Sequence, residues 1–181
     1  MATSVPFRTN SEQRLPSYFY RLSSRAQRTY LKSESVERFD YVASPGARNS
    51  LDALMRVLEA DNLAAVTTCA RALTAEICRT LRTPPVNVEV RGVRPRNTRG
   101  ELHGLFYPYD MRARRQPYIV LWMRTAQRHD VVKPKTFVRT LMHEIGHYLD
   151  YALLRLEDSY HTQGFFKRES SLVRALFDSR T

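Results

Sequence analysis

The stretch Lys135-Thr-Phe-Val-Arg-Thr-Leu-Met-His143-Glu144-Ile-Gly-His147-Tyr-Leu-Asp150 decides the fold of this chain. Its apolar residues recur at steps of three and four, so we predict a helix over residues 135–156. These apolar residues share one broad helical face: Phe137, Leu141, Ile145, Leu149, Ala152, Leu153 and Leu156. His143 and His147 fall on the opposite side, so the helix is expected to bury one face in a core and turn both imidazoles toward a cleft.

The segment His143–His147 is an H-E-x-x-H motif. Two imidazoles one helical turn apart can bind a single zinc ion, so His143 and His147 are predicted ligands of one Zn²⁺ per chain. Glu144 is offset toward the side where a zinc-bound water would lie, and it is the predicted general base. The motif therefore predicts a zinc-dependent metallopeptidase that hydrolyses peptide bonds with water.

A catalytic zinc site of this type needs a third protein ligand and an open fourth position. A metzincin would carry that ligand six residues after His147, where this chain has Leu153, so that class is excluded. The downstream candidates are His161, which we prefer, and Glu169. With Glu169 as the ligand, the chain would be a gluzincin-type peptidase; otherwise Glu169 is expected to support a ligand from behind.

Other polar residues near the motif are candidates for supporting roles. Asp150 follows His143 by seven residues and shares its helical face, so it is expected to orient a metal-binding imidazole. Tyr160 is the first candidate to stabilise the oxyanion, and Tyr151 and Tyr109 are further ones.

The rest of the chain predicts an α+β fold in a single domain, residues 1–181. After a flexible arm at 1–17, residues 18–83 are expected to be helical, with one or two short helices over 18–32, a long one from about Asn49 or Ser50, and one over 63–81. Strands are expected over 86–90, 102–107 and 117–122, joined by two hairpin-like basic connections. A small antiparallel-containing sheet thus precedes the metal helix and a C-terminal helix over 165–177, a zincin-like arrangement.

Positive charge is concentrated just ahead of the metal helix. The 181 residues have a formal net charge of +11, and residues 91–139 hold twelve basic and three acidic side chains, a net charge of +9. Arginines in the two connections are the predicted nucleic-acid contacts: Arg94, Arg96, Arg99, Arg112, Arg114 and Arg115. The segment favours DNA as a partner, in addition to a protein or peptide substrate.

An alternative function is a nucleic-acid-binding protein whose zinc site is structural or vestigial. Glu144 argues against this, because a structural site has no use for a general base and normally closes with a fourth ligand. Cys69 and Cys78 are nine residues apart on one predicted helix and are expected to be reduced thiols. No run approaches the roughly 18 apolar residues of a membrane span, so a cytoplasmic protein with no membrane partner is expected.

Spacing beyond the motif is similar to that of a known family. After His143-Glu144-x-x-His147 come thirteen residues and then His161-x-x-x-Phe165-x-Lys167, a pattern that resembles the SprT-like zinc metalloproteases. The apolar run Ile119–Trp122 before the metal helix is also similar, and the resemblance covers about residues 84–170. It implies that 84–181 form a metallopeptidase core with His143, His147 and His161 as ligands and Glu144 as base, acting on DNA-associated proteins.

Overall fold

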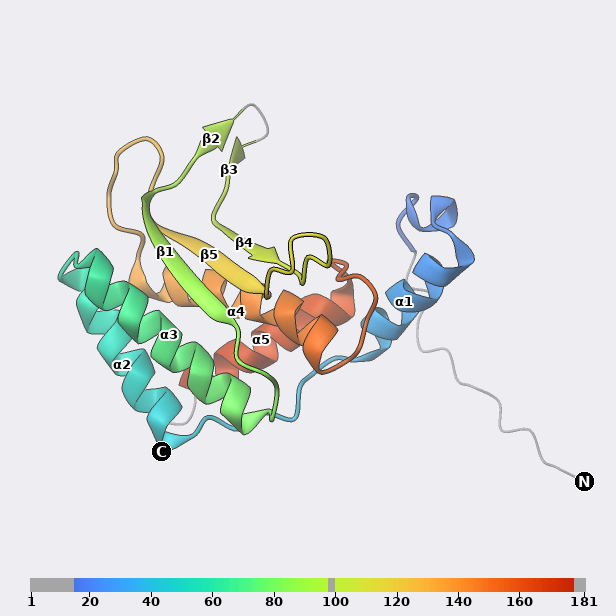
Figure 1. The fold of residues 1–181 in the computed structure, drawn as a ribbon, viewed down its shortest axis with the longest axis horizontal. Coiled ribbons are helices and arrows are strands. Elements are labelled where there is room, and N and C mark those ends of the chain that lie inside the picture. Colours follow the sequence, from blue (N-terminus) through green and yellow to red (C-terminus); the bar gives the residue numbers. More distant parts are fainter. Residues whose placement is uncertain (1–14, 98–99, 178–181) are drawn as a thin grey trace, which may run out of the picture.

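The computed structural model describes residues 15–97 and 100–177. Its elements, in chain order, are η1 (Phe19–Arg21), α1 (Ser24–Ser35), α2 (Pro45–Glu59), α3 (Leu63–Thr80), β1 (Asn87–Val93), β2 (Arg96–Asn97), β3 (Gly100–Glu101), β4 (Gly104–Tyr107), β5 (Tyr118–Arg124), α4 (Pro134–Ala152) and α5 (Gln163–Phe177) (Figure 1). The predicted α+β fold is confirmed. The predicted arm at 1–17 lies outside the described residues except for its last three.

The sheet contains three strands in the order β1-β5-β4. β1 pairs parallel with β5, with Val88 opposite Ile119, and β4 pairs antiparallel with β5, with Phe106 opposite Ile119. The second basic connection, from β4 to β5, is therefore the predicted hairpin. The first connection, from β1 to β4, does not join neighbouring strands, because β5 lies between them, but it contains an antiparallel ribbon of its own, β2–β3. The parallel pair of β1 and β5 needs a crossover, and this ribbon and β4 supply it.

Helices α1, α2 and α3 begin at side chains that cap them. The Ser44 hydroxyl accepts a hydrogen bond from the Ala47 N–H at 3.0 Å, and Pro45 occupies the first turn, where its missing N–H costs nothing. α2 thus starts at Pro45 rather than near the predicted Asn49. Asn62 caps α3 in the same way through the Ala65 N–H at 3.0 Å.

α4 lies against the sheet with its apolar face in the core (Figure 1). Phe137, Leu141, Ile145 and Leu149 are each no more than 1% exposed, and they belong to one buried cluster that also includes residues of α2, α3, α5, β1 and β5. The helix ends at Ala152, before the predicted 156, because the chain folds back there: the Leu156 N–H donates to the Asp150 carbonyl. This reversal returns the α4–α5 connection toward the histidine face of α4.

Both cysteines are free, as predicted, with Cys78 buried and Cys69 partly buried in α3. Within residues 15–97 and 100–177, no helix combines the length and the apolar character needed to cross a membrane.

Candidate metal centre

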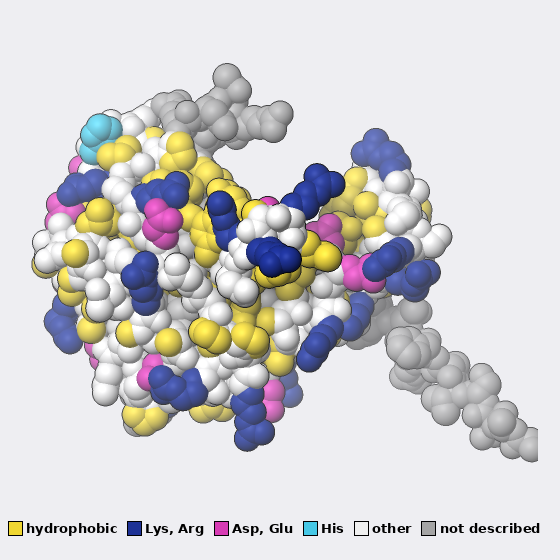
Figure 2. Space-filling view, in the orientation of Figure 1, with side chains coloured by type: hydrophobic (Ala, Val, Ile, Leu, Met, Phe, Trp, Pro, Cys, Tyr) yellow, Lys and Arg dark blue, Asp and Glu magenta, His cyan; other side chains and the backbone are white. Residues whose placement is uncertain are grey.

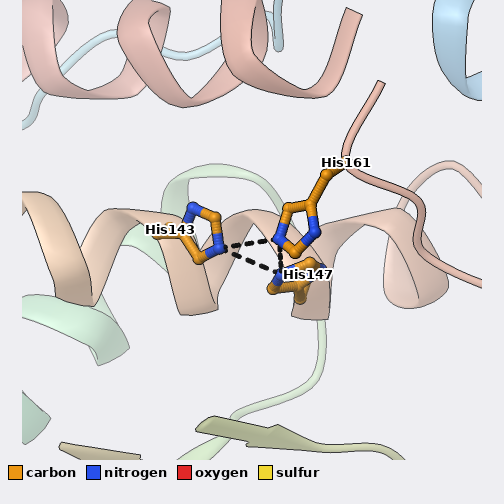
Figure 3. A group of neighbouring side chains, drawn as sticks. All are labelled: His143, His147 and His161. Atoms are coloured by element: carbon orange, nitrogen blue, oxygen red, sulfur yellow. Dashed lines mark hydrogen bonds between the residues drawn. The ribbon is translucent and has the colours of Figure 1, made fainter. Parts of the chain in front are cut away.

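Three imidazoles converge on one point at the surface of α4. His143 and His147 come from adjacent turns of the helix, and His161 reaches them from the α4–α5 connection (Figure 3). Their Nε2 atoms form a triangle with sides of 3.0 Å (143 to 161), 3.1 Å (147 to 161) and 3.2 Å (143 to 147). Among the described residues these three histidines form a group that could hold a metal ion.

The far nitrogens of two of these rings determine where their protons lie. His143 Nδ1 is 3.0 Å from the Glu169 carboxylate, so it carries a hydrogen and donates it. His147 Nδ1 is 2.7 Å from Ser159 Oγ, whose own hydrogen goes to Asp150 at 2.7 Å, so this Nδ1 is also a donor. In the neutral rings both Nε2 atoms then present lone pairs to each other, an arrangement that a cation between them would stabilise.

Glu169 lies behind His143 rather than in the group of converging nitrogens. Its carboxylate accepts from His143 Nδ1 and, at 3.2 Å, from Arg139 Nε. Burial raises the pKa of Glu169, but these two partners outweigh burial and hold the pKa below its ordinary value. An ionised carboxylate that accepts from the far nitrogen fixes the orientation and the tautomer of the imidazole. The geometry therefore matches the second of the two predicted roles of Glu169, in which it supports a ligand from behind.

Asp150 lies behind His147, with one hydroxyl between them. Its carboxylate accepts from the Ser159 hydroxyl, which contacts His147, and from the Arg168 guanidinium at 2.9 Å. The far nitrogen of His143 is occupied by Glu169 from α5, a contact that helical spacing within α4 cannot reveal. Asp150 is thus placed to support an imidazole, as expected, but indirectly through Ser159.

Glu144 is enclosed between α4 and the edge strand β4. Its side chain is 6% exposed, and the nearby Phe106 backbone N–H favours its charged form. A Cβ at Gly104 would lie 2.7 Å from Glu144 Oε1, so only glycine lets the strand approach this closely. Burial raises the pKa of Glu144 to about 7, against the opposing effects of His143 and Phe106, and burial lowers the pKa of His147 to about 3, which keeps that imidazole neutral.

Several of these contacts were not predicted. Ser159, Phe106 and Gly104 were not identified, nor was Phe165, whose ring stacks on His147 with centroids 4.5 Å apart. Phe165 is part of the His161-x-x-x-Phe165-x-Lys167 pattern that resembles the SprT-like metalloproteases. That resemblance did not predict a contact between the Phe165 ring and His147. Gly104 carries one sequence signal, a glycine inside a short predicted strand, which often marks a close backbone approach.

The tyrosines proposed for the oxyanion make other contacts. The Tyr160 ring packs on Tyr30 of α1 with centroids 5.6 Å apart, and the Tyr151 hydroxyl donates to Asp158 at 3.2 Å. Neither contact involves the three histidines. Tyr109 is half exposed on the β4–β5 connection.

The predicted nucleic-acid contacts divide into three groups. Arg94 is only 6% exposed and bonds His103 at 2.9 Å, which corrects its placement on a basic surface. Arg112, Arg114 and Arg115 are exposed on the β4–β5 connection. Arg99 and the side chain of Arg96 lie outside the described part of the chain. Figure 2 shows Lys and Arg side chains scattered over the visible face, with no single gathered patch.

A scan against protein-family models, a search of curated proteins and a search of solved structures each found no match. The resemblance to SprT-like metalloproteases therefore stays a prediction from short motifs. The geometry of the three histidines and Glu144 is the basis for assigning a function.

Proposed function

We propose that the chain is a zinc-dependent endopeptidase in which His143, His147 and His161 hold the metal and Glu144 is the general base. One observation carries the proposal. Glu144 lies on the same helix as two of the three converging histidines, and its carboxyl group lines a surface pocket. A structural zinc site has four protein ligands, whereas a catalytic site has three and keeps one position for water or substrate.

The donor set fits zinc. Zn–N distances of about 2.0–2.1 Å in a tetrahedral site place ligand nitrogens about 3.3 Å apart, and the three Nε2 separations of 3.0–3.2 Å are close to this value. Neutral imidazoles oriented by carboxylates from behind are typical zinc ligands. A bound zinc ion would supply a Lewis acid that polarises the scissile carbonyl and lowers the pKa of water.

Glu144 performs the proton transfers in this proposal. Its carboxylate accepts a proton from the attacking water and returns it to the nitrogen of the leaving amine. Burial raises the pKa of Glu144 to about 7 without a metal ion, and the charge of a bound ion would lower it, so the carboxylate would be ionised and able to accept a proton at neutral pH. The Phe106 backbone N–H favours the charged carboxylate, and Glu144 lines the pocket between β4 and α4.

Metal removal tests the proposed function. The purified chain is expected to contain about one zinc, to cleave a reduced and alkylated protein, to lose this activity with 1,10-phenanthroline and to regain it with added Zn²⁺. Zinc content is measured by elemental analysis and cleavage by mass spectrometry. The non-chelating 1,7-phenanthroline is the control, and cleavage that survives complete zinc removal would contradict the proposal.

The third ligand is tested by comparing two variants. His161→Ala removes a nitrogen of the triangle and is expected to weaken zinc binding severely, since two protein ligands remain. Glu169→Gln keeps the shape of the group behind His143 but removes its charge, and a loss of about 10–100-fold in affinity is expected. Competition with a fluorescent zinc chelator measures both. A larger loss in Glu169→Gln than in His161→Ala would instead make Glu169 the ligand.

A further inference from the structure

An apolar pocket opens beside the C-terminal half of α4. Its volume is about 350 Å³, and its walls include Pro84, Pro117, Phe106, Tyr148 and Tyr151. The connections before β1 and between β4 and β5 both reach this end of the helix (Figure 1). Such a volume is near the lower end of the range for ligand sites, roughly 300–1,000 Å³, and suits one large side chain.

Phe106 lies between this pocket and Glu144. Its backbone N–H lowers the pKa of the Glu144 carboxyl group, and its ring packs against Tyr148 and Tyr151 at centroid distances of 6.2 and 5.7 Å. On α4, Tyr148 follows Glu144 by four residues and Tyr151 follows His147 by four, so each lies one turn along the same face. The pocket therefore begins one helical turn from the proposed general base and metal ligand.

The walls of the pocket are mainly apolar, and the two tyrosines of α4 turn their rings rather than their hydroxyls toward it. The Tyr148 hydroxyl donates to the Pro84 carbonyl, and the Tyr151 hydroxyl donates to Asp158, so both present their rings. A charged group placed between such rings and prolines would lose its hydration without gaining a partner. The opening on the other side of Glu144 differs, because Arg139 and Glu169 line it.

We propose that this pocket binds a large apolar side chain, aromatic or branched aliphatic, of the substrate residue that flanks the scissile bond. The inference rests on the proposed peptidase function and adds the class of substrate. A peptide bond held at Glu144 places its flanking side chains on either side along α4, and the side toward Tyr148 and Tyr151 excludes charge. The enzyme would then prefer those substrates whose side chains bury the most apolar area in this pocket.

The test uses the zinc-loaded full-length chain and a peptide library with cleavage sites mapped by mass spectrometry. We expect Phe, Tyr, Leu or Ile at one fixed position next to the cleaved bond. We also expect kcat/KM to be at least about 10-fold higher for Phe than for Gly at that position. Cleavage with no preference there overturns this inference alone, whereas no cleavage of any peptide overturns the proposed function and this inference with it.

Two variants fill the pocket from different elements. Ala152→Phe acts from the end of α4 and Gln116→Trp from the β4–β5 connection, and both residues line the pocket. Each is expected to lower the Phe-to-Gly ratio of kcat/KM toward one, with zinc content unchanged. Ala113→Phe, at an exposed position of the same connection, is the matched control and should keep the ratio. An unchanged ratio in both folded pocket variants would overturn the inference.

Discussion

Replacing Glu144 with glutamine is expected to lower kcat for peptide hydrolysis by about 10²–10⁴-fold, the usual contribution of a positioned general base. The amide has nearly the shape of the carboxyl group, so it can still fit against Gly104 and Thr140. It cannot accept the proton of the attacking water. Since Glu144 is not one of the three converging ligands, zinc content is expected to stay at one per chain.

The measurement pairs initial rates of peptide cleavage with elemental analysis of the same samples. Glu59→Gln, at the exposed end of α2, makes the same chemical change away from the histidines and should leave both values unaltered. Wild-type activity in a zinc-loaded Glu144→Gln variant would remove Glu144 from the mechanism. Loss of zinc together with activity would instead show that Glu144 supports the metal site.

The part of the site on α4 could be predicted because helical periodicity is local. Phe137, Leu141 and Ile145 repeat at the spacing of one buried face, and this spacing alone places His143 and His147 on the other face. The class of fold could be predicted from a change of period, from three and four in the helices to two in β1. Both predictions need only residues that are close together in the sequence.

Contacts between distant segments could not be predicted in this way. β1 pairs parallel with β5 across an intervening hairpin, and the strand patterns were compatible with a simple meander. Glu169 and Ser159 reach the backs of His143 and His147 from a helix and a connection that come after α4 in the chain. Their partners depend on how α5 packs against α4, which the spacing of residues within one helix does not contain.

Arg168 is the strongest example of such a contact, and replacing it has the second large expected effect. Its side chain and that of Asp150 are both 0% exposed, and they form an ion pair at 2.9 Å. The guanidinium also donates to the Ser33 hydroxyl at 2.9 Å and to the carbonyls of Ser33 and Val36. One side chain of α5 therefore binds both α4 and the C-terminal end of α1.

Arg168→Met is expected to lower the free energy of unfolding by about 3–5 kcal/mol, because it leaves the Asp150 carboxylate buried without its cation. Urea unfolding, with the slope compared between variants, measures the change. Lys167→Met is the matched control: Lys167 bonds Glu37 in an exposed ion pair, and its loss should cost about 1 kcal/mol or less. Equal losses in the two variants would show that the buried pair makes no special contribution.

The pH dependence of this loss identifies its cause. Burial raises the pKa of Asp150 above its ordinary value even though Arg168 opposes the shift, so removing Arg168 raises the pKa further. In Arg168→Met the folded chain then holds a proton on Asp150 that the unfolded chain releases above about pH 4. The deficit relative to wild type should therefore be small near pH 4 and grow as pH rises through the folded pKa of the variant. The double variant Arg168→Met/Asp150→Asn has no carboxylate to ionise at position 150 and should lose this pH dependence. If the pH dependence persists in the double variant, the lowered free energy of unfolding comes from the lost contacts with α1 instead.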